Sequence, residues 1–387
     1  MRRLPIEERA DWRSAAEAIG FVFHHMDGRR YWDERAYYAF TLEQVETDLE
    51  PAAQTLHAMC LELVAEACAS ERLMERLAIP RMAWDLVAAS FGADEPSLYG
   101  RFDFAYDGAG PPKLYEYNAD TPTSVFEASV VQWLWLEDQI RARRLPAHAD
   151  QFNSLHEKLV ARLGGLVPPA STLTFTCVED AVEDRQTVRY LEDAAAQAGL
   201  RTRFTDIARI GVDDHDRFVD AEDYVIQTLF KLYPWEDLFR EPYAFNIAAS
   251  GTRFIEPAWK AVLSNKAILP LLWERHPGHP NLLPAFFDDD PKAASLGVSF
   301  VRKPFFSREG ANIELVEDGR GEAVLDQGYG AEGHVRQALH PLPRFDAGYP
   351  VIGAWMVGDE AAGIGVREDD LRVTQDRSRF VPHAIVD

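Results

Sequence analysis

The stretch from Gly100 to Asn118, GRFDFAYDGAGPPKLYEYN, decides how the centre of this chain folds. Two short runs of alternating apolar and polar residues flank a turn rich in glycine and proline, and this pattern predicts a β-hairpin. Arg101 and Asp103 share one face of the first strand because they are two residues apart, and Glu116 and Asn118 share one face of the second. If the two faces coincide, the hairpin carries a guanidinium, two carboxylates and an amide in one patch.

Two interpretations of this patch follow from the residues. Oxygen donors from two carboxylates and one amide suit a hard divalent cation, which predicts a magnesium site at Asp103, Glu116 and Asn118. Alternatively, Arg101 forms a salt bridge with Asp103 or Glu116 on a solvated sheet face, and Asn118 begins an Asx-turn toward Asp120. The hairpin alone leaves both interpretations open.

Outside the hairpin, the hydrophobic pattern predicts a mixed α/β (α+β) protein. Apolar residues recur every three or four positions over residues 50–80, which predicts an amphipathic helix closed by Pro80, and a second helix is expected over 126–144. From Ser171 the chain has the pattern of a strand, an acidic loop, a helix and a second strand, so we expect a βαβ-like unit in an α/β domain over 166–255. Strands joined by turns are expected after about residue 297, most plainly in SFVRKPFF, EAVLDQ and YPVIGAWMVG.

Composition narrows the possible partners. The chain has 387 residues, 47% of them hydrophobic, and a formal net charge of -23, and such a negative field opposes binding to a nucleic-acid backbone. There is no apolar stretch of about 18 residues that would predict a membrane span. The three cysteines form no CxxC pair, which fits a reducing compartment. We therefore expect a cytoplasmic protein with neither a nucleic-acid nor a membrane partner.

Two lysines stand where they could bind phosphate. Lys266 lies near the start of an apolar run, and Lys303 ends a β-rich run that is followed by a small polar loop containing Ser307 and Gly310. An ammonium and the free backbone N–H groups of a glycine-containing loop can both bind phosphate, although a lysine before a turn is more often simply exposed. The chain contains no GxSxG, HExxH, Walker GxxxxGK[ST] or GxGxxG motif, so other common catalytic templates are not indicated.

Five segments in order resemble the glutathionylspermidine synthase family of ATP-grasp ligases. The resemblance covers nearly the whole chain, from about residue 10 to the end, and is strongest for the synthetase-only members, because we find no amidase-like cysteine segment before the first motif. The five segments are RFD (101–103), YEYNADTPTS (115–124), SNKAILPLLWE (264–274), RKPFFSREGANI (302–313) and GIGVREDDLRVTQDRSRFVPH (363–383).

This resemblance implies an ATP- and Mg²⁺-dependent reaction that joins a carboxylate to an amine through an acyl-phosphate and releases ADP and phosphate. It also implies a permuted ATP-grasp fold, since the metal residues precede the lysines here. The implied organisation is a helical segment plus metal hairpin over 1–165, a central pre-ATP-grasp-like α/β subdomain over 166–255, a lid over 256–335, and C-terminal strands over 336–387 that complete the core.

The resemblance assigns roles residue by residue. Asp103, Glu116 and Asn118 match the magnesium ligands, and Arg101 matches the catalytic arginine that stabilises the transferring phosphoryl group and the oxyanion. The residues that match the ATP-binding positions are Lys266 and Lys303 on the phosphates, Ser307 and Gly310 in the loop that closes over them, Gln337 at the adenine hinge, and Arg367 as a second phosphate-binding arginine.

One segment departs from the family pattern. Glutathione-using members continue after EYNAD with small serines and a cysteine, whereas this chain has Thr121, Pro122, Thr123 and Ser124. Pro122 stiffens the loop and removes an N–H donor. We therefore expect another small-molecule or peptide carboxylate and another amine as substrates. A non-catalytic ATP-binding regulatory or assembly protein with the same fold remains the alternative.

Overall fold

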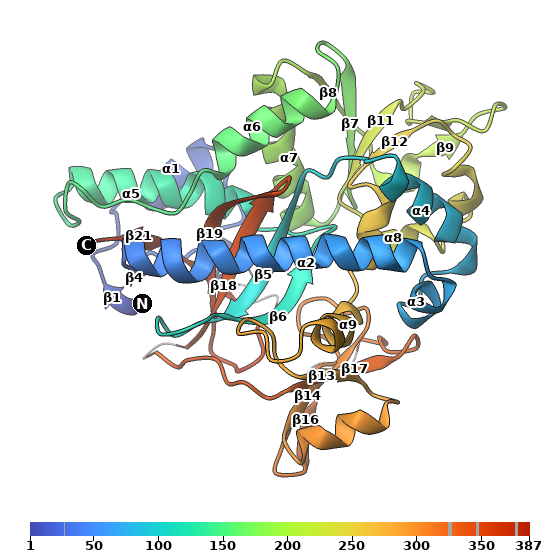
Figure 1. Ribbon diagram of the computed structural model, residues 1–387. Helices are drawn as coiled ribbons and strands as arrows, with labels where there is room; N and C mark the ends of the chain where they lie inside the picture. The colour runs from blue at the N-terminus through green and yellow to red at the C-terminus, as the bar shows by residue number, and fades with distance from the viewer. Residues whose placement is uncertain (27, 324–326, 346–347, 376–377) are drawn as a thin grey trace.

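The computed structural model of this chain describes all residues except 27, 324–326, 346–347 and 376–377 (Figure 1). Within the described residues the architecture is mixed α/β with several separate sheets, as the sequence predicts. None of the described helices combines the length and the apolarity that crossing a membrane requires.

The predicted hairpin forms and lies inside a five-stranded sheet. β5 (Tyr99–Ala105) pairs antiparallel with β6 (Lys113–Asn118), and Asp103 stands opposite Glu116. Strands from the end of the chain extend the sheet on the far side of β5, in the order β20-β19-β18-β5-β6. These strands are β18 (Tyr349–Val357), which confirms the strand predicted at YPVIGAWMVG, β19 (Glu360–Asp369) and β20 (Arg379–Val381).

A long helix covers one face of this sheet. α2 (Glu50–Cys68) runs across it (Figure 1), and a ring nitrogen of its His57 lies 3.1 Å from the hydroxyl of Tyr117. The rings of Phe102 and Tyr117 stack with centroids 3.8 Å apart, in the same buried cluster as the apolar side chains of α2. Because side chains alternate along a strand, the polar residues of the hairpin lie on the opposite face.

The prediction of a single helix over residues 50–80 is wrong for the second half of this range. α2 ends at Cys68, and α3 (Glu71–Arg76) begins after Ser70, whose hydroxyl accepts the backbone N–H of Leu73 at 3.3 Å. Serine is a preferred N-cap, so the chain breaks and restarts there although the apolar spacing continues. The other helices of this layer are η1 (Gln44–Leu49), α4 (Trp84–Gly92) and α9 (Ile268–Arg275).

The predicted βαβ unit forms within a parallel sheet, which lies above the five-stranded sheet in Figure 1. β7 (Thr172–Thr176) leads through α7 (Val182–Gln197) to β8 (Arg201–Phe204), and β8 pairs parallel to β7. The sheet has the order β12-β11-β7-β8. Its other elements are β11 (Thr228–Lys231), β12 (Arg253–Ile255), α6 (Leu155–Leu166), which packs on α7, and the short α8 (Trp235–Leu238), with the small ribbon of β9 (Gly211–Val212) and β10 (Phe218–Val219) beside them.

A third sheet is antiparallel and has the order β13-β17-β14-β15-β16. The strand predicted at SFVRKPFF is confirmed as β14. The strand predicted at EAVLDQ begins with Glu322 and Ala323, which end β16, and residues 324–326 lie outside the described part of the chain. The strands are β13 (Ala285–Phe287), β14 (Phe300–Pro304), β15 (Glu314–Glu317), β16 (Arg320–Ala323) and β17 (His334–Ala338).

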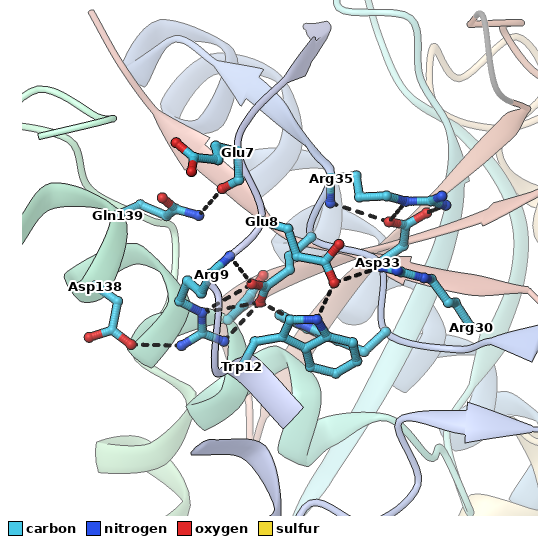
Figure 2. A network of polar contacts seen from close by, with 12 residues as sticks. Glu7, Glu8, Arg9, Trp12, Arg30, Asp33, Arg35, Asp138 and Gln139 are labelled. Carbon is cyan, nitrogen blue, oxygen red and sulfur yellow. Dashed lines mark hydrogen bonds and ion pairs between the residues drawn. The ribbon is translucent and has the colours of Figure 1, made fainter. Parts of the chain in front are cut away.

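Polar contacts fasten the N-terminal segment to a helix that follows the hairpin (Figure 2). Arg9 donates to Asp138 of α5 (Gln132–Arg141) at 2.7 Å and to the buried Glu34 at 2.8 Å. η3 (Glu127–Val131) continues directly into α5, which confirms the helix expected here. The N-terminal elements are β1 (Arg2–Pro5), α1 (Trp12–Ala18), β2 (His25–Met26), β3 (Arg29–Arg30) and β4 (Ala36–Phe40), and β4 pairs with both β1 and β21 (His383–Ile385).

Candidate active site

The polar face of the hairpin gathers the four residues that its pattern singles out. The guanidinium of Arg101 donates to both carboxylate oxygens of Asp103, at 2.7 and 3.2 Å. The side-chain nitrogen of Asn118 lies 3.1 Å from Asp103 and 3.1 Å from Glu116. The salt bridge of the second interpretation therefore exists, but its solvated face does not, since Arg101 is only 5% and Asp103 only 3% exposed.

Cationic side chains surround these carboxylates. The ammonium of Lys266 lies 3.2 Å from Glu116 and donates to the backbone oxygen of Ser307 at 2.8 Å. Arg367, on β19, donates to Asp103 from the other side. Residues from β5, β6 and β19 and from the loops that contain Lys266 and Ser307 therefore lie together.

Lys303 and Gln337 form a buried pair beside this cluster. The ammonium of Lys303 donates to the side-chain oxygen of Gln337 at 2.7 Å and to the backbone oxygen of Tyr115 at 3.0 Å. Gln337 in turn donates to the backbone oxygen of Leu114 at 3.0 Å. These contacts join β14 and β17 of the third sheet to the hairpin.

Electrostatics in the cluster favour a phosphate ligand. Burial would raise the pKa of Glu116, but the charges of Lys266 and Lys303 and the hydrogen bond from Asn118 hold it below its ordinary value. Burial lowers the pKa of Lys303 to about 8, against the attraction of Glu116. An anionic ligand would compensate this buried ammonium.

Two polar groups at the centre lack a partner among the described residues. The Nε–H group of Arg367 and the hydroxyl of Ser307 are buried and make no hydrogen bond within the described chain. Arg101 differs, because its guanidinium also donates to the backbone oxygen of Thr123 at 2.8 Å. Buried polar groups normally have partners, so Arg367 and Ser307 have donors to offer a ligand.

The cluster opens into a cavity with an apolar floor, which we call the strand cavity. It encloses about 890 Å³, including the solvent at its mouth. Its lining includes the charged residues Asp103, Glu116, Lys266, Lys303 and Arg367, the apolar residues Val301, Ile313, Leu315, Leu342 and Val351, and also Ser307, Gly310 and Gln337.

A second cavity, the acidic cavity, shares four lining residues with the strand cavity: Glu116, Ser307, Glu309 and Arg367. It encloses about 1270 Å³ on the same measure. Arg101, Asn118 and the loop 121–124 line one side of it. The two cavities together bring all of the predicted site residues into one continuous site.

The opposite side of the acidic cavity holds residues that the sequence interpretation did not identify. Glu183 and Asp184, in the first turn of α7, line it together with Tyr31. Burial, and then the charge of Glu183, raise the pKa of Asp184 to about 7. In the sequence, Glu183 and Asp184 belong to the acidic stretch around the start of α7. Acidic residues are common at the start of a helix, so this stretch did not mark them as site residues.

The loop 307–310 lines both cavities. Gly310 has a φ of +72°, and a Cβ at this position would lie 2.7 Å from the backbone oxygen of Thr374. Arg308 of the same loop donates to the Thr121 hydroxyl and to Glu236, both at 2.9 Å. The loop is therefore hydrogen-bonded to Thr121 of the loop that follows the hairpin and to Glu236 of α8, and its Gly310 lies close to the backbone at Thr374.

The donor set of the hairpin fits magnesium. Mg²⁺ is bound in proteins by one or two carboxylates together with substrate phosphates, and Asp103, Glu116 and Asn118 supply two carboxylates and an amide beside the lysines. No group of three or more His, Cys, Asp or Glu side chains suited to a metal occurs in the described part of the chain. A zinc-type centre is thus not indicated there.

Comparisons with known proteins agree on one family. The family model for the glutathionylspermidine synthase preATP-grasp region matches residues 3–386. A protein from Haemophilus influenzae, provisionally named acid–amine ligase, is 42% identical in an alignment of 383 positions that covers 95% of this chain and 95% of that protein. A bifunctional glutathionylspermidine synthetase/amidase from Escherichia coli K12 is 28% identical over 92% of this chain, which spans 60% of that protein.

A trypanothione synthetase from Crithidia fasciculata is 27% identical over 82% of this chain, which spans 52% of that protein. Among solved structures, a glutathione synthetase-like effector from Globodera pallida matches with a TM-score of 0.62 at 12% identity, covering 97% of this chain and 96% of that one. The likeness at this identity concerns the fold.

Proposed function

The chain belongs to the glutathionylspermidine synthase family, and from that premise we propose that it is an ATP- and Mg²⁺-dependent ligase that joins a carboxylate to an amine through an acyl-phosphate. One observation carries the proposal: two cavities share Glu116, Ser307, Glu309 and Arg367, and one of them is lined by apolar residues and buried lysines, the other by further acidic residues. A nucleotide and an acid–amine pair need two such compartments with a shared reacting centre.

ATP fits the strand cavity. The apolar side chains of its lining suit the adenine ring, and residues 338–341, which follow Gln337, also line it. Lys266 and Lys303 of the same lining would hold the phosphates. The buried ammonium of Lys303 and the unpartnered hydroxyl of Ser307 support this orientation.

Asp103, Glu116 and Asn118 would hold the magnesium ion, with Asp103 and Glu116 as the anionic ligands. The bound ion supplies charge neutralisation on the phosphate oxygens. Arg101, which is committed to Asp103 and Thr123, mainly fixes the position of Asp103 and the loop. Arg367 also donates to Asp103, but its Nε–H has no partner among the described residues, and it lines both cavities, so it can contact the transferring phosphoryl group directly.

The reaction has two steps. The substrate carboxylate attacks the γ-phosphoryl group, the bond from its phosphorus to the bridging oxygen of the β-phosphate breaks, and ADP leaves with the electron pair. Arg367 and the two lysines offset the repulsion between the carboxylate and the phosphate oxygens. The amine then attacks the acyl-phosphate, and phosphate leaves. Water would hydrolyse this intermediate, and the loop that Gly310 and Arg308 fasten over the site excludes it.

We further propose a permuted ATP-grasp fold with the metal hairpin in residues 1–165, the central subdomain in 166–255, the lid in 256–335 and the completing strands in 336–387. The loop at Pro122 supports a substrate pair other than glutathione and spermidine. Its backbone oxygen accepts the hydroxyl of the buried Tyr99 at 3.0 Å, which holds the loop against the core. The acid and the amine would then bind against a loop that is already held in place before they arrive.

The proposal can be tested before the amine is known. Hydroxylamine intercepts acyl-phosphates, so the protein is incubated with MgATP, hydroxylamine and a panel of carboxylic acids, including glutathione, and both ADP and hydroxamate are measured. We expect hydroxamate and ADP in equal amounts with at least one acid, and neither product with the Glu116→Gln protein. ADP binding without hydroxamate from any acid would favour the non-catalytic alternative instead.

A further inference from the structure

The strand that carries Glu116 and Asn118 has little backbone support where these two residues lie. β6 is an edge strand, so only one of its sides pairs with another strand. Its pairing with β5 is interrupted beside Glu116, because a shift in register leaves Tyr115 as an extra, unpaired residue. Among the described residues, the backbone of 116–118 makes no hydrogen bond outside the pairing with β5. The ladder alone therefore fixes the two side chains poorly.

The other end of β6 is held from outside the sheet. The backbone oxygen of Asn281 accepts the N–H of Leu114 at 2.8 Å. Gln337 donates to the backbone oxygen of Leu114 at 3.0 Å, and Lys303 donates to that of Tyr115 at 3.0 Å. All three contacts lie before Glu116, so the end of the strand that carries the candidate metal ligands needs another support.

Tyr117 supplies this support from the opposite face of the strand. Its ring stacks on Phe102 with centroids 3.8 Å apart, and its hydroxyl lies 3.1 Å from Nδ1 of His57 in α2. The contact is closed to solvent, since Tyr117 is 4% and His57 1% exposed. Gly100 leaves room for it, because a Cβ there would lie 2.9 Å from the tyrosine oxygen. A shift of Tyr117 would move the candidate ligands on either side of it.

His57 is itself fixed to the sheet. Its Nε2 lies 3.1 Å from the carboxylate of Asp359, in the turn between β18 and β19. Gln54, one turn earlier on α2, donates to the backbone oxygen of Asp359 and accepts the N–H of Ala361 at 3.2 Å. A carboxylate only accepts, so Nε2 carries a hydrogen and Nδ1 faces the tyrosine hydroxyl. The imidazole thus joins β6 to the turn of the neighbouring strands.

Magnesium makes a stricter demand on ligand positions than calcium does. Mg²⁺ requires near-ideal octahedral geometry with short bonds, whereas Ca²⁺ accepts longer bonds and flexible arrangements of its oxygen ligands. Groups behind the ligands are part of such a site, and their loss typically lowers metal affinity about 10–100-fold. A contact that holds two candidate ligands in place should therefore matter more for Mg²⁺ than for Ca²⁺.

Resting on the proposed magnesium site, we propose that the hydrogen bond between His57 and Tyr117 gives this site its preference for Mg²⁺ over Ca²⁺. Both side chains lie on the face of the sheet opposite the candidate ligands, so neither would contact the ion. They are positioning residues: His57 acts on Tyr117, and Tyr117 acts through the backbone on Glu116 and Asn118. Without the hydrogen bond this end of β6 can shift, and the stricter ion loses more affinity than the tolerant one.

The test measures binding and needs no substrate. Isothermal titration calorimetry gives the affinity for ADP with excess EDTA, with saturating Mg²⁺ and with saturating Ca²⁺. The ratio of the affinity with a metal to the affinity without it is the metal enhancement. Tyr117→Phe, which keeps the stacked ring, should lower the Mg²⁺ enhancement about tenfold and the Ca²⁺ enhancement less than about twofold. Its metal-free affinity for ADP should equal that of the wild type.

Two substitutions of His57 separate the two ends of the imidazole. The amide of asparagine can take the place of Nδ1, and that of glutamine the place of Nε2. His57→Asn should therefore keep the preference for Mg²⁺, whereas His57→Gln should lose it as Tyr117→Phe does. Tyr106→Phe is the matched control, because it removes a hydroxyl that donates to Asp48 of η1 at 2.6 Å, in the same helical layer but not beside a candidate ligand. Both enhancements should stay unchanged in this control.

The outcomes separate this inference from the proposed function. An equal loss of both enhancements, an unchanged Mg²⁺ enhancement in Tyr117→Phe, or the same selective loss in Tyr106→Phe overturns the role of the contact. Loss in His57→Asn but not in His57→Gln assigns the effect to the Asp359 side and also overturns it. If Tyr117→Phe does not fold, the two His57 variants decide. A wild-type protein whose ADP affinity no metal changes refutes the magnesium site of the proposed function itself.

Discussion

If Lys303 holds a phosphate group as proposed, nucleotide binding should depend on pH, and the buried ammonium sets the size of the effect. Burial lowers the pKa of its ammonium to about 8 in the ligand-free protein. Phosphate oxygens favour the charged form, so nucleotide binding moves the pKa back toward its ordinary value of about 10.4. The bound state therefore holds a proton that the free state loses above pH 8. Affinity for the magnesium–nucleotide complex should fall as the pH rises, and should be about tenfold weaker at pH 9 than at pH 7.

Isothermal titration calorimetry with MgADP tests this directly. Titrations at each pH in two buffers of different ionisation enthalpy should report uptake of about 0.1 proton per nucleotide at pH 7 and about 0.9 at pH 9. Lys303→Arg is the matched control, since an arginine stays charged across this range and should bind with little pH dependence. Equal affinity of the wild type at pH 7 and pH 9, or the same slope in Lys303→Arg, would refute the reasoning.

Two further substitutions test other parts of the site. Gly310→Ala should weaken MgATP binding at least about fivefold, because a left-handed alanine costs about 1 kcal/mol and its Cβ would lie 2.7 Å from the backbone oxygen of Thr374. Gly297→Ala, with a similar φ of +71° and open space around its Cβ, is the control and should bind normally in the same calorimetric assay. Lys231→Met should lower the free energy of unfolding by about 3–5 kcal/mol, because Asp120, at 2.6 Å in a fully buried ion pair, loses its partner. Urea unfolding should show that adding Asp120→Asn restores much of this loss, and a double variant as unstable as the single one would contradict the argument.

Local patterns predicted the elements of the fold better than their assembly. The alternation in 99–118 was enough for the hairpin, and the switch from alternation to helical spacing after Ser171 was enough for the βαβ unit. The pairing of β18 with β5 joins residues about 250 positions apart, and burial of the whole sheet decides it. Here the resemblance to a family supplied the expectation. Ser70 is a possible N-cap, so the helix break could in principle be predicted from the sequence. The apolar spacing continues across this position, however, and favours an unbroken helix.

The two halves of the candidate site differed in how far sequence could predict them, for a physical reason. Triphosphate and magnesium demand fixed residue types, and Asp103, Glu116 and Asn118 stand within one contiguous hairpin whose geometry is set by its register. The acidic wall has no such constraint, because Tyr31 and the two carboxylates at the start of α7 come from segments that meet only after folding. A carboxylate at the start of a helix is common, and in a chain with a net charge of -23 it carries no signal of its own. What distinguishes Glu183 and Asp184 is that they line a cavity that Arg101 also lines. Since this cavity also takes in Tyr31 and the loop 121–124, which lie far from α7 in the sequence, its acidic wall could be recognised only from the folded protein.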